Sequence, residues 1–300
     1  MLTFKKFIKE QTLIEGGNAV KGVGPINQEN SMATYEKCLK EYLPKFGLKK
    51  NQAVSLGSTG KKAPKATSGD IDIALSAPDL LKSNKINTFE DIIDKIVSVC
   101  KSLGHDYRDM RGIGIVSIAY PIVNVDGLQE GEKVQVDFMV VESVKLASWM
   151  YYSPSYLEST LKGLYRNEAN IAVAKHAGFK VTEFDKETKE PISWERFWFS
   201  LTKGLVKGKA TRKSAKTGNI VKQARSFDKE TVYDDADDIV RFLYGDKYTS
   251  KNILTFDDAL NAILSSGFPH KKNKRKILKM IAKGIQDKGY PIPESLDKYV

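Results

Sequence analysis

Three aspartates have the spacing expected of a metal site. Asp70 and Asp72 are two residues apart in a segment, residues 70–75, that alternates acidic and apolar side chains as a half-buried strand does. Residues two apart on a strand project from one face, so both carboxylates share one side. A third acid, Asp137, stands in a later strand-like run, residues 134–141. Three carboxylates gathered without a cation would repel one another, so the cluster predicts a pair of hard divalent ions, Mg²⁺ or Mn²⁺.

A glycine-serine turn precedes these aspartates. Residues 57–60 (GSTG) end a short apolar strand, and their backbone N–H groups and two hydroxyls suit a phosphate chain. Lysines follow at once and would neutralise a leaving pyrophosphate. The candidate phosphate-binding residues of this segment are Gly57, Ser58, Thr59, Lys61, Lys62 and Lys65.

The order and spacing of these elements resemble a known signature. The motif LGS at residues 56–58, an eleven-residue gap and DIDI at residues 70–73 are similar to the signature of the DNA polymerase beta-like nucleotidyltransferase superfamily. Asp137 resembles the third carboxylate of that superfamily. The resemblance covers residues 50–142. It implies a twisted mixed β-sheet with helices on one side, two bound divalent metals and a nucleoside triphosphate such as ATP as donor.

The matching positions imply a role for each residue. Gly57 and Ser58 would hold the triphosphate, and Asp70 and Asp72 would ligate the metals. Asp137 would ligate the catalytic metal and help to activate the attacking hydroxyl. Catalysis of this kind rests mostly on positioning and charge neutralisation.

The flanking sequence predicts the elements that would hold this site. Apolar residues recur at helical spacing over residues 29–47 and 88–104, and Thr88 caps the second helix with acids in its first turn. Together with the strands, these helices form a mixed α/β layer, and residues 1–14 add a short amphipathic helix. The predicted strands occupy residues 52–57, 70–75, 114–123 and 134–141.

The second half of the chain has a helical pattern. We place a domain boundary near residue 147, between a nucleotidyltransferase catalytic domain (1–147) and a helical, basic substrate-binding domain (148–300). The predicted fold class is therefore α+β, a twisted, palm-like mixed sheet followed by an all-helical domain. Helices are predicted over residues 155–177, 193–206, 233–244, 255–266 and 272–288. Predicted core positions at helical spacing are Trp194, Phe197, Trp198 and Leu201.

In members of the superfamily, a helical domain after the third carboxylate often contacts the nucleotide. By that resemblance, Arg166 and Lys175 are candidates for phosphate contacts, and Tyr156 or Tyr165 for stacking on the base. A helix surface with exposed basic residues and half-buried tyrosines accounts for the same pattern equally well.

Positive charge is concentrated in the last hundred residues. The chain has a net charge of +11, and residues 201–300 hold 21 Lys and Arg against 12 Asp and Glu. Residues 203–225 contain eight basic residues and no acid, as a flexible loop along a nucleic-acid backbone would. Residues 271–276 form a second basic run at a helix start, where the helix dipole disfavours it. Both segments predict RNA binding, although a solvated basic surface has the same composition.

Other functional classes lack their signatures. The two cysteines and three histidines have no zinc-ligand spacing. Cys38 and Cys100 lie in apolar helical patterns, which predicts free thiols in a reducing cytoplasm. No apolar run of about 18 residues predicts a membrane span, and residues 1–14 lack a secretory cleavage site.

The leading hypothesis is a metal-dependent nucleotidyltransferase that moves a nucleoside monophosphate from an NTP to an acceptor hydroxyl and releases pyrophosphate. The basic half favours the 3′ end of RNA, with tRNA as a candidate, as the acceptor. The second hypothesis is transfer to a protein or a small molecule, as in toxin-like or antibiotic-modifying relatives. The third is an inactive nucleic-acid-binding relative, against which the three retained carboxylates argue.

Overall fold

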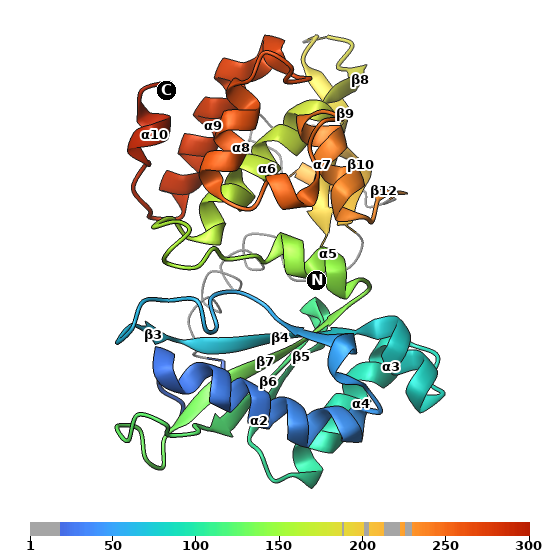
Figure 1. Cartoon of the computed structure of the whole chain (residues 1–300). Helices are drawn as coiled ribbons and strands as arrows, with labels where there is room; N and C mark the ends of the chain where they lie inside the picture. The colour runs from blue at the N-terminus through green and yellow to red at the C-terminus, as the bar shows by residue number, and fades with distance from the viewer. Residues whose placement is uncertain (1–18, 188, 201–203, 213–222, 226–229) are drawn as a thin grey trace. The chain divides into compact units, whose positions relative to one another are not determined.

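Contacts divide the chain into two compact units, residues 1–160 and 161–300. The predicted boundary near residue 147 falls within α5 (Val144–Met150), inside the first unit. The helix predicted over residues 1–14 lies outside the described part of the chain. This computed structural model describes residues 19–187, 189–200, 204–212, 223–225 and 230–300 (Figure 1).

A five-stranded mixed sheet is the centre of the first unit. Its strand order is β2-β4-β7-β6-β5, in which β4 and β7 run parallel and the other neighbours run antiparallel. β-Branched residues are frequent in β4 and β7, as a buried pleated surface favours. This confirms the mixed sheet predicted for residues 50–142. The strands are β2 (Ala53–Ser55), β4 (Asp70–Ser76), β5 (Tyr107–Met110), β6 (Ile115–Pro121) and β7 (Lys133–Val141), and a separate pair is formed by β1 (Ile26–Asn27) and β3 (Thr67–Ser68).

Helices cover one face of this sheet (Figure 1). α2 (Gln28–Phe46), α3 (Ala77–Asn84) and α4 (Phe89–Ser102) share one buried apolar core with the sheet residues Ile71 and Phe138. Every second residue of a strand points to the same side, so the residues between these core positions face the opposite side of the sheet.

The helix ends follow their sequence signals. The Thr88 hydroxyl accepts a hydrogen bond from the Asp91 N–H at 3.1 Å, and the Asp91 carboxylate accepts one from the Thr88 N–H at 3.0 Å. This capping box starts α4 where the sequence predicts. Gly47 ends α2 with a φ of +70°, the left-handed conformation expected of a glycine after a helix.

The second unit contains a β-sheet, so the prediction of an all-helical domain is wrong. Its antiparallel sheet has the order β11-β10-β9-β8, and β12 pairs with β10. The strands are β8 (Lys180–Phe184), β9 (Pro191–Ser200), β10 (Gly204–Arg212), β11 (Gln223–Arg225) and β12 (Glu230–Tyr233). The helices are α6 (Gly163–Ala177), α7 (Ala236–Tyr244), α8 (Phe256–Leu264), α9 (Lys274–Asp287) and α10 (Glu294–Asp297).

The helix predicted over residues 193–206 is replaced by β9 and β10. The segment PISWERFWFS is rich in aromatic residues, which favour strands. Side chains alternate between the two faces of a strand, so Phe197, three residues after Trp194, faces the opposite side from Trp194 and Trp198, whereas a helix would gather all three on one face. Accordingly Trp194, Phe197 and Trp198 are only partly buried and do not form the predicted core, and Leu201 lies outside the described residues.

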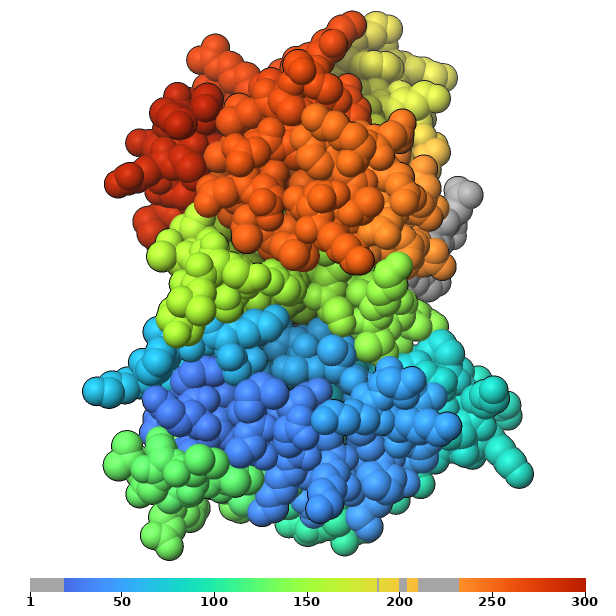
Figure 2. Space-filling view, viewed as in Figure 1, coloured from blue at the N-terminus to red at the C-terminus, as the bar shows by residue number. Residues whose placement is uncertain are grey.

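The segment after β12 forms the face of the second unit that the space-filling view presents, coloured orange to red (Figure 2). It holds α7, α8, α9 and α10, and the helices predicted over residues 233–244, 255–266 and 272–288 are confirmed apart from their ends. Among the described residues, no helix combines the length and the apolar character that crossing a membrane requires.

Candidate metal centre and nucleotide site

Sheet pairing brings the three predicted carboxylates together. β4 and β7 are parallel neighbours, and Asp72 is the register partner of Asp137. Alternation along β4 puts Asp70 on the same side as Asp72, opposite α2, α3 and α4. One carboxylate oxygen from each aspartate lies within 4.8 Å of the other two. Because all three donors are carboxylate oxygens, the cluster fits a hard cation such as Mg²⁺ or Mn²⁺.

The protonation of the cluster also fits a cation. Burial, followed by the charges of Asp70 and Asp137, holds the pKa of Asp72 well above its usual range. Burial raises the pKa of Asp137 to about 6, and the negative charge of Asp70 adds to this rise. The Ser117 hydroxyl and the Gln135 amide oppose the rise. A bound divalent cation would remove the repulsion and favour the ionised form of all three groups.

Cation binding should therefore weaken in acid. Without a bound metal, the pKa of Asp137 is about 6 in the folded chain, against its ordinary value of 3.8. The protonated group therefore stabilises the fold fully below about pH 3.8. That stabilisation is lost as the pH rises through about 6, because Asp137 then ionises beside the other carboxylates. A bound cation offsets this repulsion most strongly above that pH. We expect Mn²⁺ to raise the melting temperature little at about pH 5 and strongly at about pH 7.5, measured by thermal unfolding. An equal increase at both pH values would contradict the assignment.

Gly57 approaches Asp72 so closely that a larger residue would not fit. Its φ is +61°, a conformation that favours glycine, and an added Cβ would lie 2.9 Å from Oδ2 of Asp72. The Gly57 N–H donates to the carbonyl oxygen of Tyr151 at 3.1 Å, which fixes the start of the turn. The structure therefore brings the predicted glycine directly to the carboxylate cluster.

The protein itself uses several N–H groups of the glycine-serine turn. The Gly60 N–H donates to Oγ of Ser31 at 3.2 Å, and the Lys61 N–H donates to the carbonyl oxygen of Ser58 at 3.0 Å. For the N–H groups of Ser58 and Thr59, the described residues provide no acceptor. The predicted phosphate cradle is thus reduced to these two N–H groups, and its role remains a prediction.

The lysines that follow the turn have different surroundings. Lys61 places Nζ 4.5 Å from the ring centroid of Tyr152, a cation–π contact. Lys62 donates from Nζ to the carbonyl oxygen of Thr67 at 2.6 Å, and Lys65 has a positive φ of 65°. These contacts allow a pyrophosphate role for Lys61 and Lys62, which stays a prediction.

Two buried polar residues beside Asp137 are not predicted from the sequence. Gln135 and Ser117 are fully buried. Gln135 donates from Nε2 to Oδ1 and Oδ2 of Asp137 at 3.0 and 3.1 Å, and Ser117 is the register partner of Asp137 on β6. The available signal is that Gln135 stands two residues before Asp137 in a strand, which puts both side chains on one face.

The predicted nucleotide contacts after the third carboxylate are in varied surroundings. Arg166 is fully buried and donates from Nη1 to the carbonyl oxygen of Leu254 at 3.5 Å, so its burial favours a structural role. Tyr165 is also buried. Lys175 is exposed in the second unit, and Tyr156, in the first unit, is 47% exposed. Contacts of Arg166, Lys175 and Tyr156 with a nucleotide remain predictions.

The two basic segments differ in structure. Residues 204–212 and 223–225 form β10 and β11, so a flexible loop is the wrong prediction for them, and residues 213–222 lie outside the described part of the chain. Residues 271–276 begin a longer basic surface along α9, and residues 259–286 contain no acid. The exposed cations of this surface are Lys271, Lys272, Arg275, Lys276, Lys279 and Lys283.

The similarity of this chain to known proteins is confined to solved structures. No family model matches the chain, and no curated protein matches it. Among solved structures, the chain is similar to the Cid1 poly(U) polymerase with MgGTP bound, at 14% sequence identity and a TM-score of 0.25. The match covers 58% of this chain and 47% of that one, so it spans about half the length of the polymerase chain. A similarity this low does not support an assignment.

Proposed function

We propose that this chain is a metal-dependent nucleotidyltransferase, which transfers a nucleoside monophosphate from an NTP to an acceptor hydroxyl and releases pyrophosphate. The observation that carries the proposal is the convergence of Asp70, Asp72 and Asp137, with an oxygen of each within 4.8 Å of the others, beside the turn that begins at Gly57. Carboxylate clusters of this kind serve two-metal phosphoryl transfer.

Different residues of the first unit would bind the metal ions and the triphosphate. Asp70, Asp72 and Asp137 would hold two Mg²⁺ or Mn²⁺ ions, which when bound would supply Lewis-acid activation of the hydroxyl and neutralise the triphosphate. The N–H groups of Ser58 and Thr59 would bind phosphate oxygens, as oriented backbone dipoles do. No side chain needs to form a covalent intermediate, because positioning and charge neutralisation supply most of the acceleration.

We further propose RNA, with tRNA as one candidate, as the acceptor that presents the 3′ hydroxyl. The exposed basic residues at and along α9 support this choice, because a cationic surface attracts a polyphosphate backbone through counterion release. A protein or small-molecule acceptor would not require such a surface.

Incubation with each α-labelled NTP, Mg²⁺ and total cellular RNA tests the proposal. Label that enters RNA and is lost on chelation with EDTA is the expected result. Label that enters only protein or a small molecule would support nucleotidyl transfer and refute RNA as the acceptor. Label in no fraction, with a chain that binds RNA, would favour the inactive relative.

Removing the charges at the start of α9 should weaken RNA binding. We expect replacement of four exposed cations by glutamine to lower the affinity for RNA and to reduce the slope of log affinity against log salt by up to about 3. Filter binding over a range of salt concentrations measures both. The replaced residues are Lys271, Lys272, Arg275 and Lys276.

The matched control removes four exposed lysines of the first unit, which should leave the salt slope nearly unchanged. If both quadruple variants lose affinity equally, the effect belongs to net charge and not to the α9 surface. The control residues are Lys37, Lys40, Lys45 and Lys49.

A further inference from the structure

A buried glutamine joins Asp137 to the N-terminal part of the chain. Gln135 is 0% exposed and donates from Nε2 to both carboxylate oxygens of Asp137. Its Oε1 accepts from the backbone N–H of Ala19 at 2.7 Å and, more weakly, from that of Val20 at 3.4 Å. Both ends of the amide therefore have partners of the correct polarity. Turning the amide over would set its oxygen against the carboxylate and its NH₂ group against two donors.

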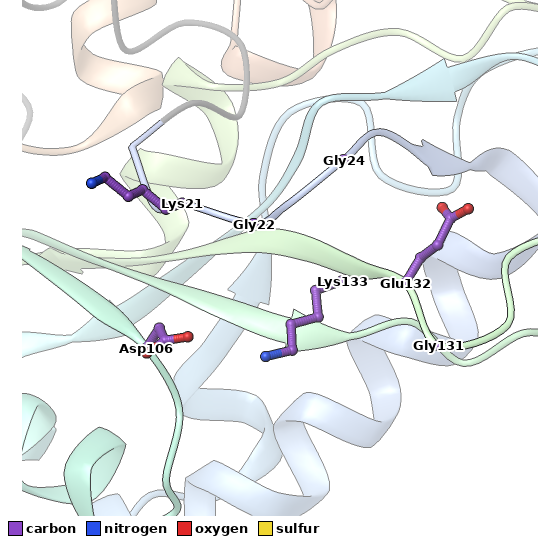
Figure 3. Close-up of a pocket in the computed structure, with 7 residues that line it drawn as sticks. All are labelled: Lys21, Gly22, Gly24, Asp106, Gly131, Glu132 and Lys133. Carbon is purple, nitrogen blue, oxygen red and sulfur yellow. The ribbon is translucent and has the colours of Figure 1, made fainter.

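The segment that supplies these N–H groups lies against β7. The Gly24 N–H donates to the carbonyl oxygen of Lys133, the first residue of β7, at 2.8 Å. Figure 3 shows the segment through Gly22 and Gly24 passing over this end of the strand, and both glycines line a pocket together with Lys133. Residues 19–24 thus contact β7 just before the strand reaches Asp137.

We infer that Gln135 is a positioning residue for the metal centre, which fixes the orientation of the Asp137 carboxylate. The backbone N–H groups of Ala19 and Val20 in turn fix the orientation of Gln135. The inference rests on the proposed function. A carboxylate can rotate about its Cβ–Cγ bond, and a donor shared by its two oxygens fixes the plane of the group. The remaining lone pairs of both oxygens can then be directed at a cation. Replacing a group that orients a ligand in this way typically weakens metal binding about 10- to 100-fold.

The test compares two buried glutamines that both hold the N-terminal part of the chain. Gln135→Met keeps the length of the side chain and removes its hydrogen bonds. The control is Gln129→Met, because Gln129 is also buried and accepts from the Asn27 N–H at 2.7 Å, yet none of its hydrogen bonds to the described residues is to one of the three aspartates. A third variant, Ala19→Pro, deletes the N–H that holds Gln135 and leaves the glutamine in place.

The measurement is the affinity of the full chain for Mn²⁺, followed by titration calorimetry, beside its melting temperature. We expect Gln135→Met to bind Mn²⁺ about 10- to 100-fold more weakly. Ala19→Pro should weaken binding by about threefold to tenfold, the effect of one lost hydrogen bond. The control should lose stability and keep wild-type affinity.

The outcomes separate this inference from the proposed function. A wild-type chain that binds no Mn²⁺ would refute the proposed metal centre, and the inference with it. A wild-type chain that binds, beside a Gln135→Met variant of equal affinity, would overturn the inference alone. If Gln135→Met does not fold, unchanged affinity in Ala19→Pro overturns it. If Gln129→Met weakens Mn²⁺ binding as much as Gln135→Met, the effect is general destabilisation and the inference is wrong.

Discussion

Replacing Asp72 by alanine should lower nucleotidyl transfer roughly a thousandfold or more and leave the fold intact. Asp72 supplies one of the three oxygens that lie within 4.8 Å of one another, so its loss leaves an incomplete cation site. In the metal-free chain, burial and the other two aspartates oppose its ionisation. The variant should therefore keep or slightly raise the wild-type melting temperature without metal, and lose most of the increase that Mn²⁺ produces.

Transfer of label from an α-labelled NTP measures the activity, and circular dichroism checks the fold. Asp70→Ala should behave in the same way, since both carboxylates stand on one face of β4. The exposed Glu130 provides a control, because Glu130→Ala removes a carboxylate of the same unit away from the cluster. Near-wild-type turnover in a folded Asp72→Ala variant would end the assignment of this cluster as the catalytic centre.

Replacing Gly57 by alanine should lower the transfer rate about a hundredfold. The added Cβ would stand 2.9 Å from Oδ2 of Asp72, so the carboxylate or the turn has to move. A displacement of about 1 Å at a reacting centre is enough for an effect of that size. The positive φ of +61° adds a loss of about 1 to 2 kcal/mol in the free energy of unfolding, because an L side chain disfavours this conformation.

Gly104 separates the two effects of that substitution. Its φ of +71° is similar, but an added Cβ would meet no atom within 4 Å. Gly104→Ala should therefore lose similar stability and keep its activity, as measured by denaturant unfolding beside the labelled-NTP assay. Equal loss of activity in both variants would show that general destabilisation, and not the close approach to Asp72, is responsible.

The first unit could be predicted from the sequence because its signals are local and agree with one another. The alternation of acidic and apolar residues from Asp70 onward predicts both the strand and the face that carries the carboxylates. Thr88 and its acidic first turn predict the start of α4. The later strand-like run and the superfamily resemblance point to Asp137 as the third acid, although only strand pairing shows that it is the register partner of Asp72.

The second unit was harder to predict because its aromatic residues fit two periodicities. Trp194, Phe197 and Trp198 have helical spacing, yet Trp194 and Trp198 are also four apart and so share one face of a strand. Pairing with β10 decides between the two, and that pairing is not visible in local sequence. The contact of Gln135 with the backbone of Ala19 escaped prediction for a similar reason, since the two residues are more than a hundred positions apart in the sequence.

The parallel pairing of β4 and β7 has a consequence for how the chain folds. Asp72 and Asp137 are 65 residues apart in sequence and meet only when a long loop has closed, which is a slow, entropically costly event. A slip of the pairing by one residue would send Asp137 into the helix-covered core. A divalent ion therefore has no binding site on the early folding chain, so it should slow unfolding while leaving the folding rate almost unchanged.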